Sequence, residues 1–231
     1  MAELIAVVGE SGSGKTTSIR NLNPEETFII STTGKRPGIA GAKKKYPSLV
    51  TDPETKEYKG NLYTTTSVDQ LSKLVKVISV KMPKIKYIII DDFQYFMAFE
   101  AMDRAKEKSY EKFTEMAQHA YQVLKDGMSL REDIYFIELS HQANTGTDIE
   151  PFYRIETLGK MLDNTITLEG LFTYVLFARP VTGEDGKIEY KFLTNSDGSC
   201  TAKTPMGLFD DLYIDNDLKL VVDRIEEYNE G

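Results

Sequence analysis

An eight-residue segment near the beginning of the chain constrains the fold more than any other feature of the sequence. Gly9-Glu10-Ser11-Gly12-Ser13-Gly14-Lys15-Thr16 matches the pattern G-x-x-x-x-G-K-[ST]. It follows the apolar run 4–8 and precedes a segment, 17–22, that we expect to be a short helix. A strand, a glycine-rich loop and a helix in this order are typical of a phosphate-binding loop. The sequence therefore predicts an α/β fold in which helices flank a mostly parallel central sheet.

The residue types in this loop explain how it would hold a phosphate group. Gly9, Gly12 and Gly14 can adopt backbone angles that side chains disfavour, so successive N–H groups can turn toward an anion. Lys15 would reach the β- and γ-phosphates of a nucleotide, the Thr16 hydroxyl would bind Mg²⁺, and Thr17 would face the α-phosphate. The alternative is a Gly/Ser turn that matches by chance. We expect the nucleotide to be bound by Gly9, Glu10, Ser11, Gly12, Ser13, Gly14, Lys15, Thr16 and Thr17.

Two adjacent aspartates follow another strongly apolar run, residues 87–90. Such a run is expected for a central strand of a parallel sheet, and ligands of open α/β sheets bind where the strands end. We expect Asp91 to hold Mg²⁺ beside Thr16, and Asp92 to orient or deprotonate the attacking water. Because aspartate is also a preferred helix cap, Asp92 could instead cap the segment that begins at Phe93.

The buried run 133–139 ends in Ser140-His141, a second polar strand end. A side chain at this place could contact the γ-phosphate or its water, or it could form an ordinary strand-end hydrogen bond. Glu138 lies inside the same apolar run. A buried carboxylate is costly unless it is paired, so either Glu138 points toward the site or the strand is at an edge of the sheet.

The remaining periodicities indicate the other elements. Ser67 and Gln70 form a capping box for a helix that ends before Pro83, and further helices are expected over 93–108, from about 109 and from about 215. Residues 51–61, 142–157 and 195–208 are expected to be turns or loops. Strands are expected over 27–31 and 62–65, and 171–181 pairs with 188–193 as a C-terminal β-hairpin. We expect one domain spanning 1–231.

Composition narrows the functional class. The chain has a net charge of −8, a single cysteine and two histidines. An intramolecular disulfide is therefore excluded, a structural zinc site is not expected, and any nucleic-acid contact has to be local. The first eight residues are too short for a signal peptide, and no apolar run approaches the length of a membrane span. We expect a soluble protein of the cytoplasm without membrane association.

A local cluster of positive charge interrupts this acidic background. Residues 33–46 contain five basic side chains and no acidic one: Lys35, Arg36, Lys43, Lys44 and Lys45. The block is either a solvated surface or a contact with a polyanion backbone or a neighbouring subunit. Tyr46, Phe152 and Tyr153 could supply stacking surfaces for bases, or they could be packed inside the protein.

Rapid phosphate hydrolysis usually needs one more cation, often from a neighbouring subunit, to stabilise the transition state. Arg154, Lys160 and Arg179 are the candidates, and we favour Lys160. The alternative, which base rates favour, is that each is an ordinary surface charge. Because the site has no evident cation of this kind, a homo-oligomer is expected.

The chain resembles phage-encoded nucleotide-binding ATPases with a RecA-like core. The resemblance lies in the order of the phosphate loop, the strand that ends in Asp91-Asp92, the helical pair, the strand end Ser140-His141 and three C-terminal segments. These segments are Gly159-Lys160-Met161-Leu162-Asp163, Glu169-Gly170-Leu171-Phe172-Thr173 and Thr204-Pro205-Met206-Gly207-Leu208-Phe209. The resemblance spans residues 4–228, and the C-terminal segments are its specific part. It implies binding of ATP and Mg²⁺ and ATP-driven action on single-stranded DNA in annealing or recombination inside the infected cell. A single-strand-binding protein is an implied partner.

One departure from RecA-like recombinases concerns the water-activating group. Those proteins carry a catalytic glutamate at the end of the strand after the phosphate-loop helix, whereas this chain has Ser31-Thr32-Thr33-Gly34 there. Either Asp92 takes over, or ATP acts mainly as a conformational ligand. The rival functions are a nucleotide-dependent adaptor or loader with little turnover, and a small-molecule phosphotransferase, for which an arginine-rich lid is missing.

Overall fold

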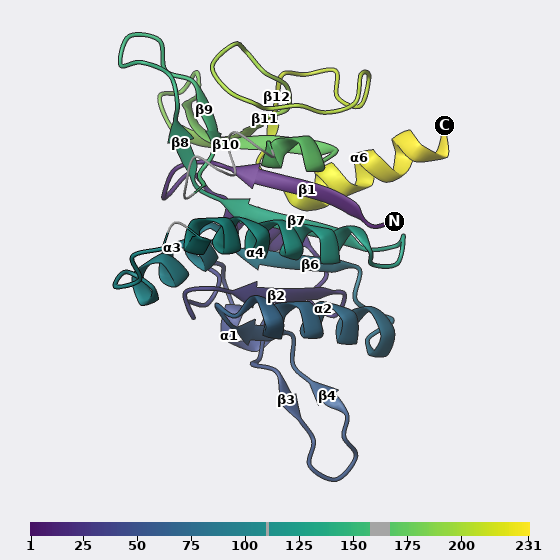
Figure 1. Ribbon diagram of the computed structural model, residues 1–231. Helices are drawn as coiled ribbons and strands as arrows, with labels where there is room; N and C mark the ends of the chain where they lie inside the picture. The colour runs from purple at the N-terminus through teal and green to yellow at the C-terminus, as the bar shows by residue number, and fades with distance from the viewer. Residues whose placement is uncertain (110, 158–166) are drawn as a thin grey trace.

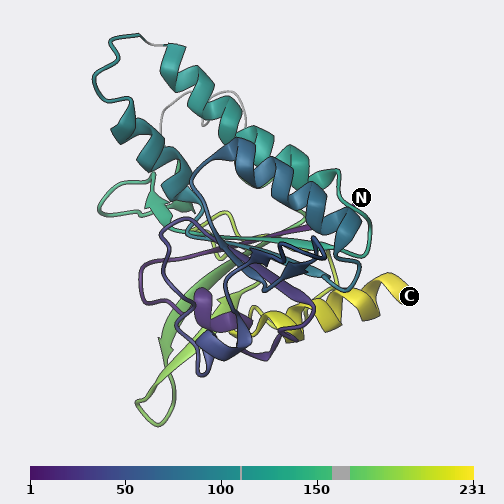
Figure 2. The same ribbon diagram turned by 90° about the horizontal axis from the view of Figure 1, so that it is seen from below.

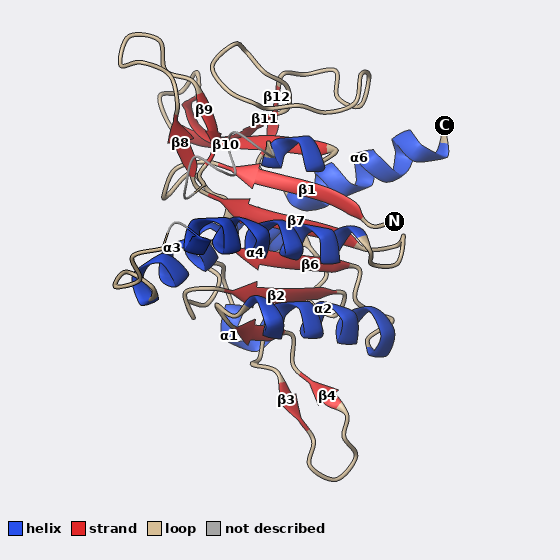
Figure 3. Ribbon diagram, in the orientation of Figure 1, coloured by secondary structure: helices blue, strands red, loops and turns tan. Residues whose placement is uncertain are grey.

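The computed structural model describes residues 1–109, 111–157 and 167–231. Within these residues, eight strands form one sheet in the order β12-β11-β10-β1-β7-β6-β2-β5 (Figures 1 and 3). Their bounds are β1 Glu3–Val8, β2 Thr27–Ser31, β5 Leu62–Thr64, β6 Tyr87–Asp91, β7 Tyr135–Ser140, β10 Tyr174–Thr182, β11 Ile188–Leu193 and β12 Tyr213–Asp215. The strands from β10 to β5 are parallel, and β11 and β12 add an antiparallel extension.

This topology confirms the expected RecA-like P-loop fold with a C-terminal hairpin. β7 lies between β1 and β6, and its register pairs Ser140 with Val8 and Leu139 with Asp91. The carboxyl ends of these three strands therefore meet at one edge of the sheet. This edge is where the phosphate loop leaves β1 and where the acidic pair leaves β6.

Helices cover both faces of the sheet. In Figure 2 one side carries the blue and teal helices α2 (Val68–Lys81), α3 (Gln94–Asp103) and α4 (Glu111–Met128). The other side carries the 3₁₀ turn η1 (Thr16–Asn21), α1 (Ala42–Lys45) and α6 (Leu218–Glu230). A second 3₁₀ turn, η2, spans Leu168–Leu171.

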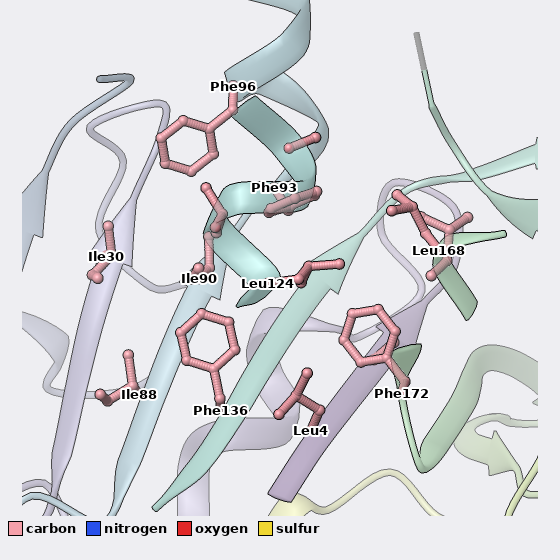
Figure 4. Packing of buried hydrophobic residues seen from close by; sticks show 14 of the residues in the cluster. Leu4, Ile30, Ile88, Ile90, Phe93, Phe96, Leu124, Phe136, Leu168 and Phe172 are labelled. Carbon is pink, nitrogen blue, oxygen red and sulfur yellow. The ribbon is translucent and has the colours of Figure 1, made fainter. Parts of the chain in front are cut away.

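Two apolar cores hold these layers together, one on each face. The first contains Leu4, Ile88, Phe93 and Phe136, packed under α2, α3 and α4 (Figure 4). The second packs the alternate strand residues, such as Ile5, against η1, α1 and α6. Strand side chains alternate between faces, so the continuous apolar runs supply both cores.

The capping box forms only in part. Ser67 Oγ accepts a hydrogen bond from the Gln70 N–H at 3.4 Å, as expected for an N-cap. The Gln70 side chain does not return to the Ser67 N–H, because it accepts from Thr65 Oγ1 at 2.8 Å, and Thr65 Oγ1 in turn accepts from the Ser67 N–H. The side chains of Thr65, Ser67 and Gln70 thus together fix the beginning of α2.

Two segments that we expected to be loops contain short antiparallel ladders. β3 (Val50–Thr51) pairs with β4 (Tyr58–Lys59) and projects from the molecule (Figure 1), and β8 (Gln142–Asn144) pairs with β9 (Tyr153–Ile155). Strands of two or three residues are too short to show a periodicity in the sequence.

Glu138 fits neither of its two expected placements. β7 is a central strand, and Glu138 lies opposite Ala6 and Ile90, two members of the core beneath α2–α4. One carboxylate oxygen accepts from Ser140 Oγ at 2.6 Å, while the other has no partner among the described residues. Complete burial raises the pKa of Glu138 to about 8, against the opposing effect of the Ser140 hydrogen bond.

We expect Glu138→Gln to stabilise the protein at pH 8 by on the order of 3 kcal/mol and to have little effect at pH 5. The folded-state pKa lies above the ordinary value of 4.5, so the native protein holds a proton that the unfolded chain releases. The stability that this proton gives the wild-type protein is fully present below about pH 4.5 and is lost as the pH rises through 8. Urea unfolding of both proteins at the two pH values measures the difference. The exposed Glu132→Gln is the control, and an equal pH dependence in wild type and Glu138→Gln would contradict the assignment.

Candidate functional site

The loop after β1 has the backbone shape that its glycines allow. Gly12 and Gly14 have φ angles of 81° and 93°, which other residues rarely adopt. Gly9 is needed for a different reason: a Cβ at this position would lie 2.6 Å from the carbonyl oxygen of Ala178 in β10. The loop is thus pressed against the neighbouring strand and turns back on itself.

Several amides of the loop remain available to an anion. Among the described residues, the N–H groups of Gly12, Gly14, Lys15 and Thr16 have no hydrogen-bond acceptor. The helix that follows differs from the expected one: it is a 3₁₀ turn over Thr16–Asn21, fixed by Ser18 Oγ donating to the Lys15 carbonyl at 2.6 Å. So short an element contributes little dipole, and the directed N–H groups carry the attraction for phosphate.

Lys15 is folded over the loop. Its Nζ donates to the carbonyl oxygens of Gly9 and Glu10, both at 2.8 Å, and the residue is 6% exposed. An ammonium has three N–H donors, so one remains for a phosphate oxygen. Burial lowers the pKa of Lys15, and the carboxylates of Asp92, Asp91 and Glu10 oppose that shift.

Thr16 and Asp91 meet at the ends of β1 and β6. Thr16 Oγ1 donates to Asp91 Oδ1 at 2.9 Å. Burial raises the pKa of Asp91 to about 6, and the nearby Asp92 adds to the shift, whereas Thr16 and Lys15 act in the opposite direction. Thr32, at the end of β2, donates to the backbone carbonyls of Asp91 and Asp92 at 3.2 and 2.9 Å. The β2 end therefore holds the acidic turn in place and brings no carboxylate of its own.

Asp92 is displayed by an unusual backbone conformation. Its φ is +64°, a left-handed angle uncommon for residues other than glycine. Its side chain forms no cap: α3 has Phe93 at its N-cap position, without a side-chain cap bond. The carboxylate lies 3.7 Å from His141 Nε2, and both side chains line one cavity. The capping alternative for Asp92 is therefore wrong.

Ser140 and His141 face different surroundings. The Ser140 hydroxyl turns into the core toward Glu138, whereas its carbonyl accepts from the Gly9 N–H at 3.1 Å and ties β7 to the phosphate loop. The His141 side chain lines the cavity, and the His141 backbone N–H donates to Gln94 Oε1 at 3.3 Å. Burial lowers the pKa of His141, with Lys15 adding to that shift, so the imidazole is neutral at pH 7.

A cavity of about 810 Å³ adjoins Lys15, Thr16, Asp92 and His141, whereas Asp91 does not line it. The phosphate loop, Thr17, Asp92 and His141 line it. It is also lined by residues that we did not expect at the site: Arg20, Glu189, Tyr190, Lys191, Asp215 and Asn216. A polar-to-aromatic alternation along β11 was visible in the sequence, but nothing in the sequence indicated which loop that strand faces.

The two candidates for the additional cation that lie among the described residues are both paired elsewhere. Lys160, the favoured candidate, lies outside the described residues. Arg154 is 3.5 Å from Glu169, and Arg179 pairs with Asp197 at 3.1 Å. Neither of the two arginines lines the cavity.

The expected stacking aromatics are placed differently from one another. Tyr46 is fully buried in the core on the η1 and α6 side, so its stacking role is wrong. Phe152 and Tyr153 are half-buried at the β8–β9 pair.

A parallel sheet with a glycine-rich phosphate loop after β1 and an aspartate at the end of β6, hydrogen-bonded to the loop threonine, defines a P-loop NTPase. The comparison with protein families agrees and is more specific. The family model described as AAA domain matches residues 1–124, more than half of the chain, and the protein belongs to this family of nucleotide-binding ATPases. A search of curated proteins finds no match. Across the described ranges, no helix has the length and apolar character required to cross a membrane.

Proposed function

We propose that the protein binds and hydrolyses ATP with Mg²⁺ and acts on single-stranded DNA. The observation that carries the catalytic half is the 2.9 Å hydrogen bond between Thr16 and Asp91, beside unpaired loop amides and the Lys15 ammonium. Hard oxygen ligands of this kind fit Mg²⁺, and a divalent cation would favour the ionised form of the buried Asp91. When bound, the ion would offset charge on the β- and γ-phosphates.

The chain's own residues then divide the work. Lys15 and the loop amides bind the phosphates, and Asp92 orients the attacking water or accepts its proton. His141, neutral and 3.7 Å from Asp92, constrains where that carboxylate lies. Thr32 and Gln94 hold the backbone that presents the two side chains.

A basic groove supports the DNA half of the proposal. A hollow of about 660 Å³ is lined by residues preceding β2 and β6, at the opposite edge of the sheet from the nucleotide cavity. Glu25 and the half-buried ring of Tyr58 also line it. Four exposed lysines, none of them in an ion pair among the described residues, surround the groove: Lys44, Lys45, Lys81 and Lys84. In a chain of net charge −8, this local excess of cations suits a phosphate backbone, and Tyr58 offers a stacking surface.

A second candidate function is a nucleotide-dependent adaptor or loader with little turnover. The observation that favours it is the lack of an uncommitted arginine in the cavity wall among the described residues. Arg20 donates to the carbonyl of Asn216, and Lys191 pairs with Asp215 at 2.7 Å. A neighbouring subunit could supply the missing cation, so we expect activity to rise with protein concentration if a homo-oligomer forms.

We expect single-stranded DNA to stimulate ATP hydrolysis severalfold, and the double variant Lys81→Glu/Lys84→Glu to abolish that stimulation while leaving the DNA-free rate unchanged. Reversed charges repel the phosphate backbone, and the groove lies far along the sheet from Lys15. The matched control is Lys106→Glu/Lys108→Glu, which changes the net charge equally at exposed positions outside the groove. The readouts are phosphate release and DNA binding, measured at two salt concentrations.

The outcomes separate the candidates. Stimulation that both double variants lose equally would reflect net charge alone and would contradict a role of the groove. ATP binding without turnover, with or without DNA, would favour the adaptor.

A further inference from the structure

The residues that line the cavity come from two parts of the chain that differ in chemistry. One part is the phosphate loop, with its free amides, Lys15 and Thr16. The other, the hairpin end, is the C-terminal extension, where β11 and β12 lie side by side. Figure 2 shows the green β10–β11 hairpin beside the purple turn that follows β1. The extension therefore completes a wall that the P-loop core alone would leave open.

The charged side chains at the hairpin end pair with one another. Lys191 Nζ pairs with Asp215 at 2.7 Å and with Glu189 at 3.1 Å, and Arg20 lies 3.9 Å from Asp217. Three carboxylates face two cations, so among the residues that the structure describes there is no unpaired positive charge at this end for a phosphate. An uncharged, flat ligand group suits this end better than an anionic one.

Tyr190 supplies a flat surface at this end. It is 48% exposed, and its Cδ1 lies 3.1 Å from where a Cβ on Gly14 would be. The edge of the ring thus contacts the phosphate loop while part of the ring remains open to the cavity. Stacking of a nucleobase on an aromatic ring is a general source of affinity.

Asn216 supplies an unused donor beside that ring. The residue is 2% exposed, and its side-chain amide nitrogen has no partner among the described residues. The same nitrogen would lie 3.3 Å from a Cβ on Gly14. The backbone fixes the pair, because the Asn216 N–H donates to the Tyr190 carbonyl at 3.1 Å. A buried amide donor without an acceptor is costly, and a ring nitrogen of a base would satisfy it.

We infer that the C-terminal extension forms the base subsite of the nucleotide cavity. The base stacks on Tyr190 and accepts a hydrogen bond from the Asn216 side chain, while the triphosphate lies in the loop. This assignment rests on the proposed binding of ATP. It adds a role for β11 and β12, which lie outside the matched region 1–124.

The test compares ATP with inorganic tripolyphosphate, which has the anionic part of ATP and no base. Calorimetric titration in the presence of Mg²⁺ is expected to give a wild-type affinity for ATP at least tenfold higher than for tripolyphosphate. Tyr190→Ala should lower the ATP affinity about tenfold and change the tripolyphosphate affinity less than twofold. Asn216→Ala should lower the ATP affinity about threefold and should also change the tripolyphosphate affinity less than twofold.

The matched control is Tyr213→Ala, because Tyr213 is 39% exposed on β12 and does not line the cavity. Equal loss of both ligands in Tyr190→Ala would mean a damaged loop and would overturn the base subsite. Wild type that binds both ligands equally would also overturn it while leaving the phosphate site intact. Wild type that binds neither ligand would remove the proposed function as well.

Discussion

Lys15→Ala is expected to lower the affinity for ATP at least about 100-fold and to remove turnover, because the ammonium held within the phosphate loop is lost. The two carbonyl contacts of Lys15, each 2.8 Å, also hold Gly9 and Glu10 in the loop. The fold should persist. Burial lowers the pKa of Lys15, so the cost of burying its charge partly offsets these two contacts, and the melting temperature should change little.

The measurements are ATP titration, phosphate release and thermal unfolding of the same preparations. Lys106→Ala is the matched control, since Lys106 is exposed and lies outside the cavity. Retained ATP affinity in Lys15→Ala would place the phosphates elsewhere. Loss of affinity together with a large fall in melting temperature would show that the lysine is structural.

The nucleotide site could be predicted from sequence because each of its parts is local. The loop pattern fixes Lys15 and Thr16 beside one strand end, and an apolar run fixes Asp91 at another. Parallel strands bring their carboxyl ends to the same edge, so the Thr16–Asp91 contact follows without knowledge of the register. The 3₁₀ form of η1 does not follow from these patterns, which do not contain the hydrogen bond from the Ser18 hydroxyl to the Lys15 carbonyl.

The parts that could not be predicted depend on contacts between distant segments. Tyr190 and Asn216 reach Gly14 only because β11 turns back antiparallel to β10 and β12 pairs with it in one particular register. The sequence alone does not indicate which segment that hairpin packs against. The same holds for Glu138: its burial follows from the place of β7 between β1 and β6, which no local pattern contains.

Asp92→Asn is expected to reduce ATP turnover about 100-fold, the lower range for loss of a positioned general base, while ATP affinity stays equal or increases. A carboxylate that orients water acts in the transition state, whereas its negative charge repels a bound γ-phosphate. The alternative, that the Asp92→Asn variant loses turnover because it unfolds, is testable. Asparagine tolerates left-handed backbone angles well, and Asp92 has a φ of +64°, so the variant should be no less stable than wild type.

Phosphate release, ATP titration and melting temperature are compared with those of two variants. Asp103→Asn removes an exposed carboxylate at the end of α3 and should behave like wild type. Asp91→Asn should lose Mg²⁺-dependent affinity, because its carboxylate, and not that of Asp92, accepts from Thr16 at 2.9 Å. If Asp92→Asn keeps full turnover, water activation lies with another group. If the wild type itself shows no turnover and Asp92→Asn only tightens ATP binding, then the acidic pair regulates nucleotide occupancy, as an adaptor requires.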